Sequence, residues 1–420
     1  MIQYKRKINE FEKMFAKSNQ QCQIAVEVES SSFIPLLIKN FKKSMIGFNL
    51  KLQGDEIIYQ KMDIPVYSLP KNIRTCKDAA NYVDLHLKVN LNETLCKIAA
   101  NENIVAISAT HMIYDGGFFI DLFPKLLNEN DDENYLNFSN PRKVPFTPKE
   151  IFPNEFQRKN MKELIKRNFD DLLHIPHVRY SAYRDPGVNN DSYIISHSHE
   201  CPASEYQFLE NKMGLTDMYW TIIPLCVMAL DGKNQDMGMS FCVDFRQLMN
   251  KTALNRLITQ NFTQINIHAE GAMPKMTIRQ VGKLIRQKFN QRKIDGTLFA
   301  SFSGICEGRS FDLPPSLFAG MSNIGRFNYK RPIVDCWAQQ TLMSKFNGCY
   351  AAFSCFSKTK HGVNTVNTRF LQPPTLLNNA DSKALFESVV YAMKNIPVDV
   401  TVEEAYDQIR RFQSKIRAKK

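Results

Sequence analysis

One short segment of the sequence combines residue types that can move a proton. In the run His111-Met-Ile-Tyr-Asp115-Gly116, an aspartate follows a histidine at the fourth position and a glycine at the fifth. A histidine whose pKa lies near neutrality can accept a proton from an alcohol, a thiol or an amine. The aspartate in the loop after it can hold the ring in place. The same residues also fit a structural histidine beside an aspartate that caps a helix.

The segments around His111 predict a strand followed by a helix. Residues 104–110 are mostly apolar and β-branched, which is typical of a buried central strand. Residues 118–127 predict a helix, and Gly116 and Gly117 precede it. We therefore expect His111 at a strand end, on the loop that enters a helix, with its ring facing a cleft.

In the other half of the chain, residues 237–246 alternate with the period of a strand, which predicts one apolar and one polar face. Apolar side chains share one face, and the other face carries Ser240, Cys242, Asp244 and Arg246. Further strands are predicted at residues 21–30, at 192–199 and within 347–369, where a polar turn is expected at 358–362. Helices are predicted at residues 32–44, 157–173, 218–230 (buried, and capped by Thr216 or Asp217), 278–292, 380–395 and 402–417.

The length of 420 residues exceeds what one hydrophobic core usually serves, so two domains or two similar halves are expected. Six prolines interrupt the pattern between residues 136 and 195. We predict an N-terminal half over residues 1–165, a linker over 166–194 and a C-terminal half over 195–420. The fold class is α/β or α+β, with mixed sheets.

Two other groups of histidines lie outside this motif, and the first could bind a metal. His197 and His199 would share one face of a strand, but neither a matching fourth ligand nor a second cluster is visible in the sequence, so a structural strand is the preferred interpretation. His174 and His177 lie in the predicted linker region and give no indication of a site.

A serine nucleophile is the alternative chemistry. The run Gly320-Met-Ser322-Asn-Ile-Gly325 narrowly misses the Gly-x-Ser-x-Gly nucleophile elbow, because its second glycine comes one residue late. A serine hydrolase that uses Ser322 is therefore the second enzyme hypothesis.

Four segments of the chain together resemble a known superfamily. The histidine motif resembles the active-site motif of the acyltransferases that include chloramphenicol acetyltransferase, alcohol acetyltransferases and peptide-synthetase condensation domains. The other three follow in that family's order, and the four span nearly the whole chain. They are residues 6–12, which resemble the opening of alcohol acetyltransferase-like members; Val243-Asp-Phe-Arg246 followed by Gln260-Asn261-Phe262; and Ser322-Asn323-Ile-Gly325.

The resemblance implies a fold, a reaction and roles for residues. Two chloramphenicol-acetyltransferase-like halves, each a sheet packed with helices, would meet at a central tunnel with His111 midway along it. His111 would be the general base in the transfer of an acyl group, acetyl in the simplest case, from acyl-CoA to a small alcohol or amine, and no metal would be needed. Asp115 would form a structural salt bridge, with Arg246 as the candidate partner. Gly116 completes the motif, Asn323 would lie near the reacting carbonyl, and Ser322 would contact substrate.

Three features depart from particular branches of the superfamily. Gln260 stands where a glycine is common, which affects only a local turn. Thr110 stands where condensation domains usually carry a second histidine, and this favours a free-standing transferase. The Asp-Phe-Gly-Trp-Gly motif of the plant branch is absent from the sequence. A non-catalytic binding protein that retains the fold is the hypothesis from a different class.

The composition indicates which partners and which cellular location are expected. The formal charge is +12, but lysines and arginines are spread in short groups without interleaved aromatics, so we predict a solvated basic surface and no nucleic-acid binding. The ten cysteines form no Cys-x-x-Cys pair, which favours reduced thiols inside the cell. The first 30 residues are charged throughout, and the longest apolar run, residues 218–230, is too short to cross a bilayer. We predict a cytoplasmic protein without a transmembrane segment.

Overall fold

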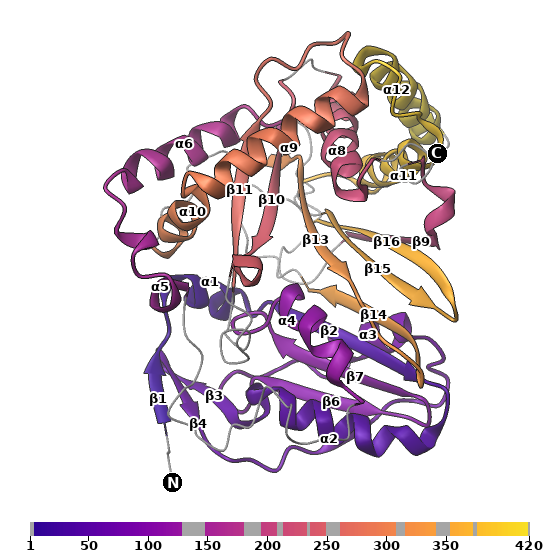
Figure 1. The fold of residues 1–420 in the computed structure, drawn as a ribbon. Helices are drawn as coiled ribbons and strands as arrows, with labels where there is room; N and C mark the ends of the chain where they lie inside the picture. Colours follow the sequence, from indigo (N-terminus) through magenta and orange to yellow (C-terminus); the bar gives the residue numbers. More distant parts are fainter. Residues whose placement is uncertain are drawn as a thin grey trace.

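The computed structural model describes residues 4–127, 148–179, 195–207, 213–232, 236–248, 261–307, 316–341, 353–372 and 376–418. In these ranges the chain forms two groups of elements, each built on a mixed sheet with helices packed against it (Figure 1). This confirms the predicted α/β class and the two sheet-and-helix halves. None of the helices in the described ranges is both long and apolar enough to span a membrane.

The N-terminal group is built around a five-stranded sheet with the order β14-β2-β7-β6-β5. All its neighbours pair antiparallel except β5 and β6. The sheet strands are β2 (Gln21–Val28), β5 (Val66–Ser68), β6 (Cys96–Ala100), β7 (Ile104–Thr110) and β14 (Ile333–Gln340). A small sheet joins β1 (Tyr4–Lys7), β4 (Glu56–Tyr59) and β3 (Leu50–Gln53), and the helices are α1 (Glu10–Ser18), α2 (Ile34–Ser44), α3 (Cys76–His86) and α4 (Gly116–Leu122).

The C-terminal group is built around a six-stranded sheet with the order β11-β10-β13-β15-β16-β9. Its strands are β9 (Ile195–Pro202), β10 (Gly238–Asp244), β11 (Phe262–His268), β13 (Gly320–Arg326), β15 (Phe353–Lys360) and β16 (Val363–Gln372). The main helices are α6 (Met161–Leu173), α8 (Leu215–Asp231), α9 (Ile278–Ile294), α10 (Thr297–Cys306), α11 (Asn379–Asn395) and α12 (Val402–Ala418). The short elements are α5 (Pro148–Ile151) and the pair β8 (His177–Arg179) and β12 (Ser316–Phe318).

Contacts cross the predicted boundaries in both directions. Helix α6 begins within residues 1–165 but packs against α10 and β11 of the C-terminal group, and β14 leaves that group to pair with β2 (Figure 1). Of the predicted linker, residues 180–194 lie outside the described residues. The division at residues 165 and 194 stays a prediction.

Lys358 lies on a strand, where the sequence predicts a turn. The polar turn was expected at residues 358–362, but β15 continues to Lys360, and the turn is made by His361 and Gly362, with φ of 44° and 86°. The Lys358 side chain is fully buried and pairs with Asp335 at 2.6 Å and Glu200 at 2.9 Å. Because Asp335 belongs to β14, this buried pair helps to fix the strand that joins the two groups.

The buried helix α8 also begins differently from the prediction. Its N-cap is Gly214, which makes no side-chain cap, whereas Thr216 or Asp217 was expected there. Asp217 instead lies in the first turn, where its carboxylate accepts a hydrogen bond from Arg286 Nε of α9 at 2.7 Å. The expected cap is wrong because the helix begins at Leu215, so that Thr216 and Asp217 both fall inside its first turn.

Candidate active site

His111 lies directly after β7, as the apolar run before it predicts. All seven residues of β7 are buried, and the His111 backbone N–H donates to the Gln20 carbonyl at 2.7 Å. The Thr110 hydroxyl accepts from the Met112 N–H at 3.2 Å and so supports the turn that follows the strand. The His111 ring stacks on Phe15 of α1, with ring centroids 4.6 Å apart. Contacts from two elements therefore fix the ring position.

The surroundings of His111 favour its neutral form. Only 7% of the residue is exposed, and burial lowers the pKa of the imidazole below its ordinary value. Backbone carbonyl groups, the charge of Asp115 and a hydrogen bond with Gln340 oppose this shift without reversing it. A ring that is neutral near pH 7 can accept a proton.

Asp115 caps α4 and binds a cation at the same time. Its Oδ1 accepts from the Phe118 N–H at 2.9 Å and from Arg246 Nη1 at 2.6 Å, and its Oδ2 accepts from the Asn261 N–H at 2.9 Å. Burial alone would raise the pKa of Asp115, but Arg246 and the two backbone donors lower it overall. The helix cap and the ion pair with Arg246, both considered from the sequence, are therefore present together.

Asp244 is a third member of this buried group. Its Oδ1 accepts from both the backbone N–H and Nη1 of Arg246, at 2.9 and 3.1 Å. Burial raises the pKa of Asp244 to about 6, with contributions from the charges of Asp115 and Asp121, although Arg246 acts in the opposite direction. The two carboxylates together raise the pKa of Arg246 and keep it charged.

The glycines of the motif allow the two groups of elements to approach closely. A Cβ on Gly116 would lie 2.8 Å from a methyl carbon of Ile324, and a Cβ on Gly117 would lie 2.1 Å from Asp244 Oδ2. Gly117 is thus the more constrained position, although Gly116 is the glycine of the predicted motif. Only a residue without a side chain fits between α4 and the end of β10.

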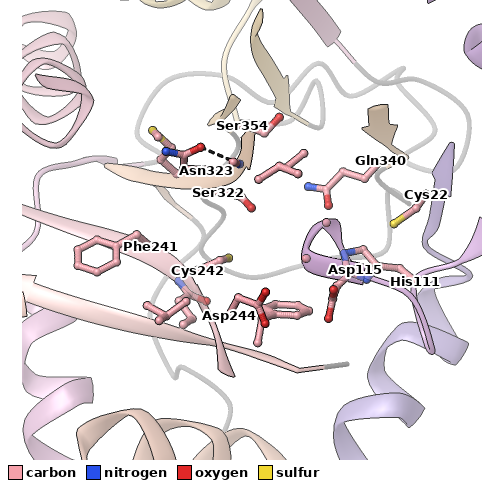
Figure 2. Close-up of a pocket in the computed structure, with 18 of the residues that line it drawn as sticks. Cys22, His111, Asp115, Phe241, Cys242, Asp244, Ser322, Asn323, Gln340 and Ser354 are labelled. Carbon is pink, nitrogen blue, oxygen red and sulfur yellow. Dashed lines mark hydrogen bonds between the residues drawn. The ribbon is translucent and has the colours of Figure 1, made fainter. Parts of the chain in front are cut away.

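A cavity of about 1190 Å³ lies where the two groups meet. It is lined by α1, the loop after β7 and α4 from the N-terminal group, and by β10, β13 and α8 from the C-terminal group. Figure 2 shows His111 and Asp115 on one wall with Gln340 above them. All the site residues predicted from the sequence line this cavity: His111, Asp115, Gly116, Arg246, Ser322 and Asn323. Their roles in a reaction stay predictions.

Ser322 and Asn323 belong to β13. The Asn323 amide donates to the Thr216 hydroxyl at 2.7 Å, and its Oδ1 accepts from the Gly325 N–H at 3.0 Å. Figure 2 shows Asn323 across the cavity from His111. Ser322 hydrogen-bonds to the Cys242 thiol on the neighbouring strand β10. Since residues 320–326 form one continuous strand, Ser322 does not occupy the strand-to-helix turn of a nucleophile elbow.

His197, a candidate metal ligand in the sequence, contacts neighbouring side chains in the fold. His197 lies on β9 and bonds the Ser382 hydroxyl through Nε2 at 2.9 Å, and its ring stacks on Phe386. Gln260 lies outside the described residues.

Two residues of the site were not found from the sequence. Phe15 stacks on His111, and Gln340 bonds its ring. Asp244, predicted on the same strand face as Arg246, pairs with it. Helix α1 could have been recognised from its capping box, in which Asn9 and Glu12 exchange hydrogen bonds. The place of Gln340 depends on the crossing of β14 between the two groups, which no local pattern shows.

No family model matches the sequence, and no curated protein matches it. Several solved structures share the fold. Polyketide synthase associated protein 5 from Mycobacterium tuberculosis matches with a TM-score of 0.61 and 13% identity, over 93% of this chain and 97% of that chain. The first condensation domain of the calcium-dependent antibiotic synthetase, in complex with a substrate analogue, matches with a TM-score of 0.65 and 10% identity, over 96% and 99%. A variant of the starter condensation domain of rhizomide synthetase, in complex with C8-CoA, matches with a TM-score of 0.63 and 10% identity, over 95% and 96%. These similarities show that the chain has a two-lobed, condensation-domain-like fold.

Proposed function

We propose that this protein is an acyltransferase in which His111 acts as the general base. The observation that carries the proposal is a buried histidine, neutral near pH 7, on the wall of a large cavity formed by both halves of the fold. The similar structures, which include condensation domains, support acyl transfer as the kind of reaction.

The reaction proceeds by direct attack. His111 takes the proton from an acceptor hydroxyl or amine while the acceptor oxygen or nitrogen bonds to the thioester carbonyl carbon. The resulting tetrahedral oxyanion collapses, the carbon–sulfur bond breaks, and His111 returns the proton to the leaving thiol. A positioned base of this kind contributes about 10²–10⁴-fold to the rate. No covalent acyl-enzyme forms.

We propose acyl-CoA as the donor, with acetyl-CoA as the simplest case. A structurally similar condensation domain was solved with C8-CoA, which supports a CoA thioester as the type of donor. The cavity of about 1190 Å³ is larger than the ~300–1,000 Å³ usual for small-molecule sites. It therefore has room for the acyl end of a thioester and a small alcohol or amine together.

Asp115 and Arg246 have a positioning role in this proposal. Their ion pair connects the loop after His111 to the 3₁₀ turn that follows β10, so it holds the base against the wall formed by the other half. Ser322 contributes to substrate binding. Asn323 holds β13 against α8 through Thr216, and its predicted place near the reacting carbonyl is part of the proposal.

Release of free thiol from a series of acyl-CoAs, measured with a panel of alcohols and amines, tests the proposal. We expect acceptor-dependent release that is lost in His111→Ala and kept in His86→Ala, a matched change at an exposed histidine outside the cavity. Flat traces across the panel, without CoA binding by calorimetry, would favour a non-catalytic binding protein. An acyl or phosphonate adduct on Ser322, detected by mass spectrometry, would instead establish the hydrolase alternative.

A further inference from the structure

Three side chains from separate segments meet on the outer edge of the C-terminal sheet. His174 follows the last residue of α6, Asp236 precedes β10, and His268 ends β11. Asp236 Oδ2 lies 3.3 Å from His268 Nε2 and 3.6 Å from His174 Nδ1. The two imidazole rings stack with their centroids 4.6 Å apart. The Asp236 carboxylate oxygen therefore lies near a nitrogen of each ring. Because the stacked rings are nearly parallel, at 15°, the half-exposed His174 ring must turn out of the stack to bind an ion together with His268.

The spacing of these atoms matches that of metal ligands. Ligand atoms about 2.0–2.1 Å from a tetrahedral Zn²⁺ ion are about 3.3–3.4 Å from one another. Both nitrogen-to-oxygen distances are close to this value, and all three candidate ligand atoms lie within 4.8 Å of one another. Imidazole and carboxylate together suit Zn²⁺ and similar divalent transition-metal ions. We propose that His174, Asp236 and His268 bind such an ion, with water in the fourth position.

The backbone holds His268 in place before any ion binds. His268 pairs with Gly238 in the β10–β11 ladder, and its side chain is only 18% exposed. A Cβ on Gly238 would lie 3.3 Å from Ile175, so the glycine allows the end of α6 to pack directly on this hairpin. Asp236 is 63% exposed and can adjust its position to complete the coordination.

The site is separate from the proposed reaction. It lies beside the first residue of β10, whereas Asp244 and Arg246 lie at and just beyond the other end, about 20 Å away at ~3.3 Å per residue. An ion here would fasten α6 to the edge strand β11, which α6 packs against (Figure 1). Its role is structural, and it stands whether or not the chain transfers acyl groups.

Calorimetric titration of untagged, chelator-treated protein with ZnCl₂ tests the proposal. We expect one ion per chain, with affinity at least about tenfold weaker in His174→Ala and in Asp236→Asn, since even a residue that only supports a ligand changes affinity by about 10–100-fold. The two side chains are 52% and 63% exposed, so the variants should fold, which circular dichroism checks. His86→Ala, at an exposed histidine in another part of the fold, should bind zinc like the wild type.

A second readout is thermal. Zinc should raise the melting temperature of the wild type and of His86→Ala, and EDTA should reverse the rise; in Asp236→Asn the shift should disappear. Absence of zinc binding to the wild type would overturn the proposal. Equal affinity in the wild type, His174→Ala and Asp236→Asn would also overturn it, because the ion would then be held elsewhere.

Discussion

Asp115→Asn keeps the shape of the side chain and removes the charge that Arg246 binds. Both side chains of the pair are only 5% exposed, and their closest atoms are 2.6 Å apart. Breaking a buried pair by removing one partner costs about 3–5 kcal/mol in the free energy of unfolding. We expect the lower end, ~3 kcal/mol, because Asp244 remains 3.1 Å from the arginine and keeps it partly neutralised.

Arg246→Met should cost more, about 5 kcal/mol, because it leaves both Asp115 and Asp244 without the cation. The double variant removes Asp115 as well and should be about as unstable as Arg246→Met alone. The coupling energy of the cycle then equals the ~3 kcal/mol cost of Asp115→Asn, at the upper end of measured couplings.

The loss in Arg246→Met should also depend on pH. Asp244 has a pKa of about 6 in the folded protein, above its ordinary value, and the loss of Arg246 raises this pKa further. A carboxyl whose pKa is raised by folding supports the fold below its unfolded pKa, and this support is lost as pH rises through the folded pKa. Arg246→Met should therefore lose more stability, relative to wild type, at about pH 8 than at about pH 5.

Urea unfolding of the four proteins, followed by circular dichroism at both pH values, measures these quantities. Additive losses in the double variant would show that Asp115 and Arg246 act independently, and the structural role of the pair would be refuted. The same result at both pH values would refute the part assigned to Asp244.

Three further predictions concern the reaction. His111→Ala should lower the rate of thiol release at least ~100-fold with an unchanged circular dichroism spectrum, and a residual rate above about a tenth of wild type would contradict the general-base role. In the wild type, kcat/KM should rise with pH and level off through an inflection below about 6.5, because burial lowers the pKa of the His111 ring; an inflection above that value would refute this. Ser322→Ala should change the rate less than about tenfold, and a loss as large as that of His111→Ala would favour the serine mechanism.

Much of the site could be predicted because local patterns of burial determine it. The apolar run that predicts a buried strand corresponds to β7, and the strand ends at Thr110, so the position of His111 follows from neighbouring residues alone. Alternation in β10 places Cys242 and Asp244 on one face, and both line the cavity. The strand ends at Asp244, so Arg246, predicted on the same strand face, lies instead in the 3₁₀ turn Phe245–Leu248 and still lines the cavity. In both cases the spacing along one strand carries the information.

The parts that could not be predicted depend on contacts between distant segments. The sequence predicts Lys358 in a polar turn, since lysine is usually exposed, and the carboxylates of Asp335 and Glu200, with the Cys336 carbonyl, explain its burial. Gln340 reaches His111 because β14 crosses to the N-terminal sheet. Likewise His174 and His268 are far apart in the sequence, and it is the packing of α6 on the β10–β11 hairpin that brings them together.

The arrangement of charge around the loop explains how a histidine so close to an aspartate stays neutral. A free carboxylate beside an imidazole stabilises the charged ring and raises its pKa. Here the Asp115 charge is largely balanced by Arg246 and by two backbone N–H groups, so burial has the larger effect on His111 and lowers its pKa. Asp115 therefore fixes the geometry of the loop while the ring remains available to accept a proton. When His111 becomes charged during the proposed reaction, the groups that favour its protonated form are the backbone carbonyls, the charge of Asp115 and Gln340.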